Sequence, residues 1–442
     1  MLAAFFHLKE KQTTVRTEFV AGLTTFLTMA YIIFVNPAIL SLTGMDKNAL
    51  VASTCIVSAL ATIFTGIFAN APIAMAPGMG LNAFFTYTLV LSGKVNWETA
   101  LGVVFLSGLF FLVLTLLGLR KKLVEAIPIG LISAISVGIG LFITFIGLVN
   151  LGIVVKNEAT LVSAGKLTPT VLIGLFGLLL MVFLEMKKIK GSLLIGIVSS
   201  TALAALFGYV PKPTEFVSLH LNIKAVALHL DILGALKWSL FASIFSLMFM
   251  NMFDGIGTLV ACCYQAKMID ENNRIKGLDR LLGIDALAAM TGALLGTSTT
   301  TAYIESAAGI EQGGRSGLTS VVTGILLLLS SALVPIVGIV PTYATAPALI
   351  LVGLFMIREV KKIDFTNLEE AFPAFIIMIM IALSYSISTG LAFGFISFVI
   401  TKIASGKTKD IKPVMWIITI LSLMFLTLDQ IGNIISLLKN RL

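Results

Sequence analysis

Two carboxylates, Asp254 and Glu305, lie in stretches of the chain that are otherwise almost entirely apolar. Asp254 is near the middle of FMNMFDGIGTLV, and Glu305 follows five hydroxyl residues in TSTTTAYIES. A charged side chain at mid-membrane costs about 2.5–3.5 kcal/mol on insertion scales, which makes such a residue a functional candidate. Two acids without a basic partner imply a cationic ligand, a protonated carboxyl or a neutral ligand rich in N–H donors.

A purely structural role is the alternative interpretation of Asp254. Asn251 lies three residues earlier and shares its helix face, and a buried carboxylate can hold helices together through a hydroxyl group or an Arg. However, we place no Lys or Arg at the predicted hydrocarbon depth to pair with it. The sequence therefore favours a binding or proton-transfer role for Asp254.

The composition indicates a polytopic membrane protein. The chain has 442 residues, of which 58% are hydrophobic and only 12% are charged, and its mean hydropathy is +1.04. Soluble domains carry about 25% charged residues. The three cysteines have neither zinc spacing nor a disulfide framework, so we expect no metal and no cofactor. The net charge of +8 is explained by membrane topology, and we expect no nucleic-acid partner.

Runs of about 20 apolar residues predict fourteen membrane segments, two of them short. They are 17–36, 48–70, 79–92, 97–118, 127–149, 169–186, 191–209, 236–264, 281–297, 303–313, 316–338, 343–357, 368–386 and 388–404. The N-terminal segment and the loops after even-numbered segments hold 21 of the 30 basic residues. This asymmetry places both ends of the fourteen-segment bundle in the cytoplasm of a cell-membrane protein. Residues 413–428 are either an in-plane helix or a fifteenth span.

The order of long and short segments suggests two halves of seven, the second inverted relative to the first. ALATIFTG at 59–66 and ALAAMTG at 286–292 both end in Thr-Gly. Thirteen residues after each of these glycines come Met79 and Glu305. Both positions are predicted to start a short helix after an interruption, so Met79 is a candidate binding residue beside Glu305.

The first interruption is at 71–85, where Pro72 and Pro77 exclude a regular helix. Residues 73–76 can be extended, and Gly78 and Gly80 leave the backbone open to a ligand. Asn82 follows one turn into the short helix. The alternative is that proline and glycine only kink a helix and that Asn82 makes an interhelical hydrogen bond.

The second interruption precedes Glu305, with a half-helix predicted to start near Tyr303. At such a helix start, the dipole and the free N–H groups favour an ionised Glu305 or an anionic ligand. Tyr303 offers an aromatic face and a hydroxyl group. Irregular backbone at this depth is tolerated only where it is buried in protein or lines a cavity.

Three other acids are interpreted as structural. Glu311 lies four residues before Arg315, and this spacing predicts an ion pair at a helix end. Asp285 is expected to cap a helix or make a local hydrogen bond. Glu18 follows Thr17 at a helix start and is expected to act as a cap there.

Four motifs together resemble the nucleobase–cation symporter-2 superfamily, and within it the AzgA-like adenine/guanine/hypoxanthine permeases. They are TEFVAGLTTFLTMAYIIFVNP at 17–37, APGMGLNAFF at 76–85, FDGIGTL at 253–259 and TAYIESAAGI at 301–310. The resemblance covers about residues 15–410. It implies an all-α polytopic fold, a seven-plus-seven inverted repeat, short β-strands in segments 3 and 10, and a homodimer that works by an elevator-like movement of its core.

The resemblance also implies a division into core and gate domains. Segments 1–4 and 8–11 form the core, at residues 1–119 and 236–340. Segments 5–7 and 12–14 form the gate, at residues 120–210 and 341–406. Residues 407–442 are left as a C-terminal apolar helix.

Substrate-binding residues follow from matching the family motifs position by position. The resemblance assigns base binding to Asp254, Glu305, Gly80 and Asn82, and places Ala30 and Tyr303 beside the base. Related uracil and xanthine carriers have Glu where this chain has Asp254, and relatives commonly have Asn where it has Ser306. The shorter Asp254 leaves more room, which fits a purine.

The resulting hypothesis is a secondary active transporter that imports purine nucleobases by cation symport, with Asp254 and Glu305 binding the base and coupling it to a proton. The family favours H⁺ over Na⁺, and the sequence does not rank adenine, guanine and hypoxanthine. Phe84, Phe85 and Phe253 are candidates for stacking. The alternatives are an anion carrier of the same fold, an intramembrane enzyme and a passive channel. An enzyme is disfavoured because the sequence has no HExxH motif.

Overall fold

The computed structural model describes residues 2–118, 127–211, 215–218, 222–269, 275 and 277–439, the last twelve of these by their backbone only. Some sequence-based expectations lie outside the described residues. These are the domain boundary between residues 119 and 120 and the basic residues Arg120, Lys121, Lys122, Lys212, Arg274, Lys276 and Arg441.

The described chain is almost entirely helical. Its first part contains α1 (Leu2–Phe5), α2 (Val15–Met29), α3 (Ile32–Leu40), η1 (Ser41–Thr43), α4 (Lys47–Ala69), β1 (Met75–Pro77), α5 (Met79–Ala83), η2 (Phe84–Leu91), α6 (Trp97–Leu116), α8 (Ile129–Leu151), β2 (Val154–Asn157), β3 (Leu161–Ala164), α9 (Pro169–Met186) and α10 (Ser192–Leu206). The second part contains α11 (Ile232–Ala235), η3 (Trp238–Leu240), α12 (Phe241–Gln265), α13 (Leu278–Leu294), β4 (Thr300–Ala302), α14 (Ser306–Glu311), α15 (Gly317–Ser330), η4 (Ser331–Leu333), α16 (Val334–Gly338), α17 (Thr342–Ile357), η5 (Arg358–Lys362), α18 (Leu368–Leu383), α19 (Ile387–Ala404), η6 (Thr408–Asp410) and α20 (Pro413–Lys439).

Many of these helices begin at polar residues whose side chains accept a hydrogen bond from the first turn. The caps are Thr14 for α2, Asp46 for α4, Asn96 for α6, Thr168 for α9 and Ser386 for α19. Between these caps the sequence is apolar on most faces, as expected for helices surrounded by protein and lipid.

Within the described residues, nine helical stretches are long and apolar enough to cross a membrane, and three shorter apolar helices accompany them. The chain is therefore a multi-pass membrane protein with a mostly helical fold. Each of the fourteen predicted ranges contains a helix, but several of these helices are too short to qualify as spans by length alone. The count of fourteen membrane segments stays a prediction.

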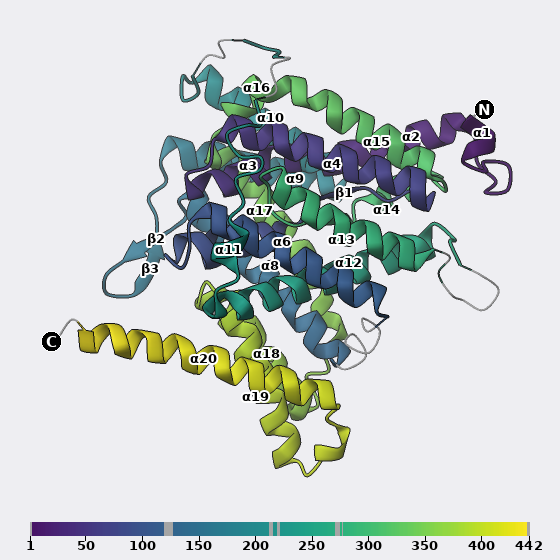
Figure 1. Cartoon of the computed structure of the whole chain (residues 1–442). Helices are drawn as coiled ribbons and strands as arrows, with labels where there is room; N and C mark the ends of the chain where they lie inside the picture. Colours follow the sequence, from purple (N-terminus) through teal and green to yellow (C-terminus); the bar gives the residue numbers. More distant parts are fainter. Residues whose placement is uncertain are drawn as a thin grey trace.

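The long helices pack into two groups, and in Figure 1 many of them lie side by side. In one group α15 packs against α4 and α2, and α13 packs against α6 and α4. In the other, α8 packs against α17 and α18, while α9 contacts α10 and α17. Small residues allow the closest crossings: a Cβ on Gly66 of α4 would come within 2.5 Å of the backbone oxygen of Gly317 on α15.

A two-stranded antiparallel pair, β1 with β4, lies inside the first helix group. Met75 pairs with Ala302, Ala76 with Thr301, and Pro77 with Thr300, and every residue of both strands is buried. The pairing joins the two interrupted stretches, which are far apart in the sequence. A second antiparallel pair, β2 with β3, forms a hairpin at the opposite end of the molecule from the N-terminal segment (Figure 1).

The expectation that Glu18 caps the start of its own helix is wrong. Thr14, not Glu18, caps α2, and the Glu18 side chain is completely buried. Its carboxylate accepts hydrogen bonds from the backbone N–H groups of Arg315, Ser316 and Thr319 and from the Thr319 hydroxyl at 2.6 Å. Glu18 therefore caps α15, a helix about 300 residues further along the chain. Sequence spacing carries no signal of such a partner.

The predicted ion pair between Glu311 and Arg315 is also wrong. Glu311 instead pairs with Lys190, at 3.2 Å. The Arg315 guanidinium donates from Nη1 to the backbone oxygens of Ile310 and Gly314. The chain turns between α14 and α15, so Arg315 points back onto the backbone. In a continuous helix, Arg315 would lie one turn from Glu311 and could pair with it.

Candidate functional site

Glu305 lies between β4 and α14, at the position just before the helix begins. Tyr31 donates a hydrogen bond from its hydroxyl to Glu305 Oε1 at 2.6 Å. Thr28 donates to the Glu305 backbone oxygen at 3.4 Å. The half-helix starts at Ser306 rather than near Tyr303 and has only six residues, so a neutral hydroxyl, more than a helix dipole, stabilises this carboxylate.

Asp254 lies on α12, which packs against both β4 and α14. It interacts electrostatically with Glu305 and with Tyr303. Among the described residues, neither carboxylate forms an ion pair with a Lys or Arg. The Asp254 side chain is exposed and Glu305 is partly exposed, so both carboxylates are accessible.

Tyr303 connects the two interrupted stretches. Its backbone N–H donates to Ala74 at 2.9 Å, and its hydroxyl donates to the backbone oxygen of Pro77 at 2.7 Å. The side chain is 5% exposed. The hydroxyl proton is thus committed to β1, and a role of the buried Tyr303 ring toward a ligand stays a prediction.

The interruption at 71–85 is packed more tightly than the sequence suggested. Asn82 is completely buried, and the Ser298 hydroxyl donates to its Oδ1. Met79 is buried beside it, with its sulfur 4.0 Å from Asn82 Nδ2. A Cβ on Gly80 would come within 2.7 Å of the Ile139 side chain on α8, so close packing requires this glycine. Asn82 thus joins α5 to the stretch between α13 and β4 rather than to another helix, and roles of Asn82, Met79 and Gly80 toward a ligand stay predictions.

Ala30 ends α2 and is buried. The chain is irregular at Ala30 and Tyr31 before α3 begins, and this irregularity places the Tyr31 hydroxyl next to Glu305. Sequence reasoning named Ala30 but missed Tyr31. The available signal was a hydroxyl-bearing aromatic residue at the centre of the apolar run TMAYIIF.

Asp285 has a larger structural role than the sequence predicted. It is completely buried on α13 and accepts hydrogen bonds from Thr301 Oγ1 at 2.9 Å and from the Ala302 N–H at 3.2 Å. A Cβ on Gly255 would come within 2.7 Å of its Oδ2, so Asp285 also lies against α12 beside Asp254. The expectation that Asp285 caps a helix or makes a local hydrogen bond is therefore wrong. Asp285 instead holds β4 in place and contacts α12.

The three phenylalanines proposed for stacking differ in position. Phe84 and Phe85 are completely buried in the hydrophobic core. Phe253 is partly exposed and lies with its ring centroid 5.7 Å from that of Phe249. Only Phe253, the neighbour of Asp254, has a ring face accessible to a ligand.

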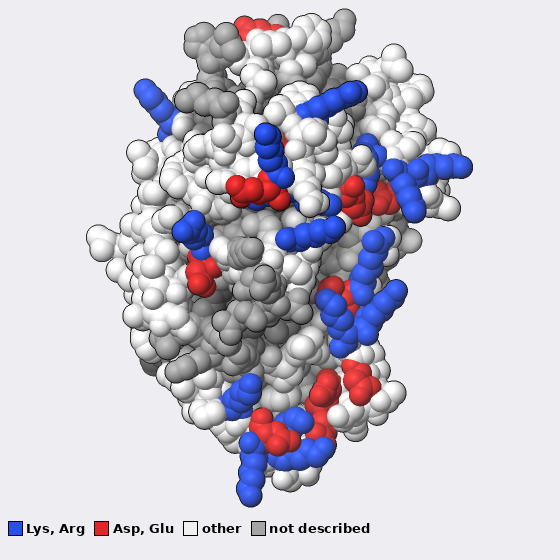
Figure 2. Space-filling model, turned by 90° about the vertical axis from the view of Figure 1, so that its right-hand side faces the viewer, with Lys and Arg blue, Asp and Glu red and all other residues white. Residues whose placement is uncertain are grey.

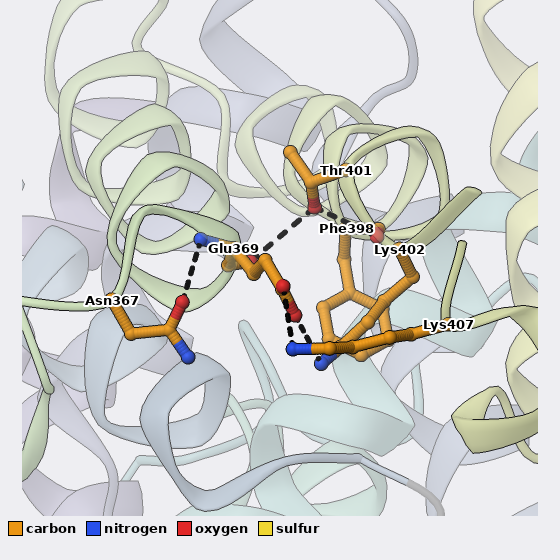
Figure 3. A network of polar contacts seen from close by, with 6 residues as sticks. All are labelled: Asn367, Glu369, Phe398, Thr401, Lys402 and Lys407. Atoms are coloured by element: carbon orange, nitrogen blue, oxygen red, sulfur yellow. Dashed lines mark hydrogen bonds and ion pairs between the residues drawn. The ribbon is translucent and has the colours of Figure 1, made fainter. Parts of the chain in front are cut away.

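A third carboxylate, Glu369, has the opposite environment (Figure 3). Lys402 and Lys407 approach its two oxygens at 2.9 and 2.7 Å. The Glu369 N–H donates to Asn367 Oδ1 at 3.1 Å, and Thr401 donates to its backbone oxygen at 3.3 Å. The Glu369 carboxylate raises the pKa of Lys407 above its ordinary value. This cluster joins α18 to α19 and the loop after it.

The apolar helices define a multi-pass membrane protein, in which Asp254 and Glu305 form no ion pair with any described residue. A protein-family model described as "Permease family" matches residues 16–393. The chain belongs to this family, the nucleobase–cation symporter-2 family. Membership in a permease family argues against the enzyme alternative.

Curated relatives of similar length support the assignment. The chain is 42% identical to the adenine permease AdeP of Escherichia coli, over 95% of both proteins. It is 41% identical to the guanine/hypoxanthine permease PbuG of Bacillus subtilis, over 94% of this chain and 97% of that protein.

Solved structures show the same fold at low sequence identity. The transmembrane domain of the cyanobacterial bicarbonate transporter BicA has a TM-score of 0.66 and 18% identity, covering 84% of this chain and 96% of that one. The murine anion transporter Slc26a9 in its inward-facing state has a TM-score of 0.64 and 10% identity, covering 89% of this chain and 69% of that one.

Proposed function

We propose that this protein imports purine nucleobases by cation symport, with Asp254 and Glu305 as the residues that bind the base. The observation that carries the proposal is the placement of two carboxylates on α12 and before α14, which interact electrostatically, are accessible and form no ion pair among the described residues. Relatives named as adenine and guanine/hypoxanthine permeases support a purine as the substrate.

The chemistry of purines fits these groups. A purine is flat and carries ring N–H and exocyclic amino donors, and a carboxylate accepts two such hydrogen bonds side by side. The rings of Phe253 and Tyr303 can pack on its faces. The Tyr31 hydroxyl holds one oxygen of Glu305 and leaves the other for the ligand.

The lack of compensating cations among the described residues supports proton coupling. Two neighbouring carboxylates repel each other when both are ionised, and neither has an ammonium or guanidinium partner among the described residues. Binding one proton together with the base removes this repulsion. We therefore assign H⁺ as the coupling ion, taken up at the Asp254–Glu305 pair and released on the other side of the membrane.

We also propose the architecture that such transport requires. Fourteen segments form a seven-plus-seven inverted repeat with core and gate domains, and the core carries the base across the membrane. The two helix-packing groups and the β1–β4 pairing between the two interrupted stretches support this arrangement. The protein is placed in the cell membrane as a homodimer with both ends of the bundle cytoplasmic. In Figure 1, α20 runs roughly along the direction of α4 and α15, which favours a spanning helix.

Uptake assays test the proposal in cells that lack their own purine carriers. We expect saturable uptake of radiolabelled hypoxanthine, competition by purines but not by uracil, and faster uptake at lower external pH without any need for sodium. Sulfate and bicarbonate should neither compete nor be transported. Sulfate or bicarbonate uptake without purine uptake would favour the anion-carrier alternative, which shares the fold.

A further inference from the structure

A second, strongly basic hollow opens on the face that carries the N-terminal segment. It encloses about 1590 Å³, including its open mouth. Its walls come from the N-terminal segment, the end of α4, the turn after α12, the start of α13 and the turn before α15. Neither Asp254 nor Glu305 lines it. Figure 2 shows Lys and Arg side chains spread over this face, with Asp and Glu between them.

The charged side chains that line this hollow are mostly cationic. Four carry a positive charge, Lys11, Lys267, Arg280 and Arg315. Among the described lining residues the one acid is Glu10, and its carboxylate lies 3.2 Å from the His7 ring. The lining therefore has a clear excess of positive charge.

Two of these cations are held in place by backbone oxygens. Lys11 Nζ donates to Asn70 at 2.6 Å and to the Arg315 backbone oxygen at 3.2 Å. Arg315 donates from Nη1 to carbonyl groups, which leaves its positive charge unneutralised. Burial lowers the pKa of Lys11, so its ammonium group is poorly hydrated where it lies. The carboxylates of Glu18 and Glu10 oppose this lowering of the pKa without cancelling it.

The other two cations, Lys267 and Arg280, are exposed and make no ion pair with any described residue. They lie at the C-terminal turn of α12 and in the first turn of α13. The α13 helix of 17 residues starts after Gly277, which also lines the hollow and offers no side-chain cap. Asp279 in the same turn is exposed and is not part of the lining.

We propose that this hollow binds a phosphate-bearing anion. Converging ammonium and guanidinium groups suit the several oxygens of a phosphate, and Arg contacts phosphate in a bidentate manner. The phosphate has two sources, the headgroup of an anionic lipid and a soluble phosphate monoester. The anion would connect the N-terminal segment, the turn after α12, the start of α13 and the turn after α14, which supply the four cations. This inference is independent of which substrate is transported.

The test compares two charge-removing double variants of the full chain in nanodiscs. In K267Q/R280Q, two unpaired cations of the hollow are lost. In the matched control K361Q/K409Q, two exposed cations outside the hollow are lost, with the same change in net charge. Adenosine 5′-monophosphate and inorganic phosphate are titrated in phosphatidylcholine nanodiscs by isothermal calorimetry. Retention of phosphatidylglycerol from mixed nanodiscs is measured by native mass spectrometry.

We expect the wild type and the control to bind at least one probe saturably and K267Q/R280Q to bind it about tenfold or more weakly, because two charge-assisted hydrogen bonds are lost. Loss in the nucleotide or phosphate arm identifies a soluble ligand, and loss in the phosphatidylglycerol arm identifies a lipid. Equal binding by K267Q/R280Q and wild type, an equal loss in the control, or no saturable binding in either arm overturns the proposal. R280Q alone replaces the double variant if that variant does not fold.

Discussion

Glu305 and Glu369 are two carboxylates of the same chain with opposite surroundings. Glu305 receives one hydrogen bond from a neutral hydroxyl and lies near a second acid. Glu369 is held by two ammonium groups at 2.9 and 2.7 Å (Figure 3). A paired carboxylate stabilises a helix junction. An unpaired one, beside another acid, has unused hydrogen-bonding capacity.

The comparison shows which carboxylate can still form strong hydrogen bonds with a ligand: Glu305 can, whereas the oxygens of Glu369 are already paired. Both sites hold a Glu at the start of a helix, Glu305 just before α14 and Glu369 in the first turn of α18, so local position alone does not distinguish them. The distinction comes from whether cations lie nearby in space.

The largest effect is expected from D254N and E305Q. Each removes charge-assisted hydrogen bonds to the base, worth about 1.5–3 kcal/mol each, so purine affinity should fall about tenfold to a hundredfold and proton-coupled uptake should be lost. Thermal stability should stay unchanged or rise, because an uncompensated charge is removed. Scintillation proximity binding and thermal unfolding in detergent measure the two effects.

E369Q is the matched control for these variants. It should lower thermal stability, since Lys402 and Lys407 lose their anionic partner, and leave purine affinity within twofold of wild type. The comparison would break if E369Q weakened purine binding as strongly as E305Q.

Replacement of Asp285 should destabilise the strand that leads to Glu305. In D285A, Thr301 Oγ1 and the Ala302 N–H lose their acceptor, at a cost of about 1–3 kcal/mol for each unsatisfied buried donor. D285N keeps one acceptor oxygen and should lose less. Chemical or thermal unfolding of the two variants should rank them in this order, and equal stability of D285A and wild type would contradict the assigned role.

Y31F should have a smaller effect, confined to ligand affinity. It removes the 2.6 Å hydrogen bond to Glu305 and leaves the ring in place, which should weaken purine binding about fivefold to tenfold. Y209F, at an exposed tyrosine, is the control. Direct binding measurements compare the purine affinities of the two variants. An unchanged affinity in Y31F would contradict a role of Tyr31 in the binding site.

The smallest effect concerns pH and the Glu369 cluster. Glu369 raises the pKa of Lys407 above the ordinary 10.5, so the ion pair contributes stability that is fully present below pH 10.5 and is lost as pH rises through the raised value. The difference in melting temperature between wild type and K407A should be constant from pH 7 to 10 and shrink above pH 10.5. A difference in melting temperature that grows at high pH would contradict the predicted direction of this pH dependence.

The sequence was informative about Asp254 and Glu305 because a charge inside an apolar run is rare and costly. The proline and glycine residues at 72–80 likewise indicate broken helices, since these residues do not fit a regular membrane helix. Both signals are local, and both predict where the chain departs from a simple span.

Partners far apart in the chain were not predictable from spacing. Glu18 caps a helix about 300 residues away, and Tyr31 reaches Glu305 across 274 positions. Asp285 lies within 17 positions of its partners, but on another element. Helical periodicity relates a residue only to neighbours three or four positions away, so the partners of these three residues required the folded structure.

Equilibrium binding of radiolabelled hypoxanthine to the purified protein tests the central assignment most directly. The wild type should bind saturably, adenine or guanine should compete, and both D254N and E305Q should lose at least about tenfold in affinity while remaining folded. Wild-type affinity in both single variants would contradict the assignment of Asp254 and Glu305 as the base-binding pair.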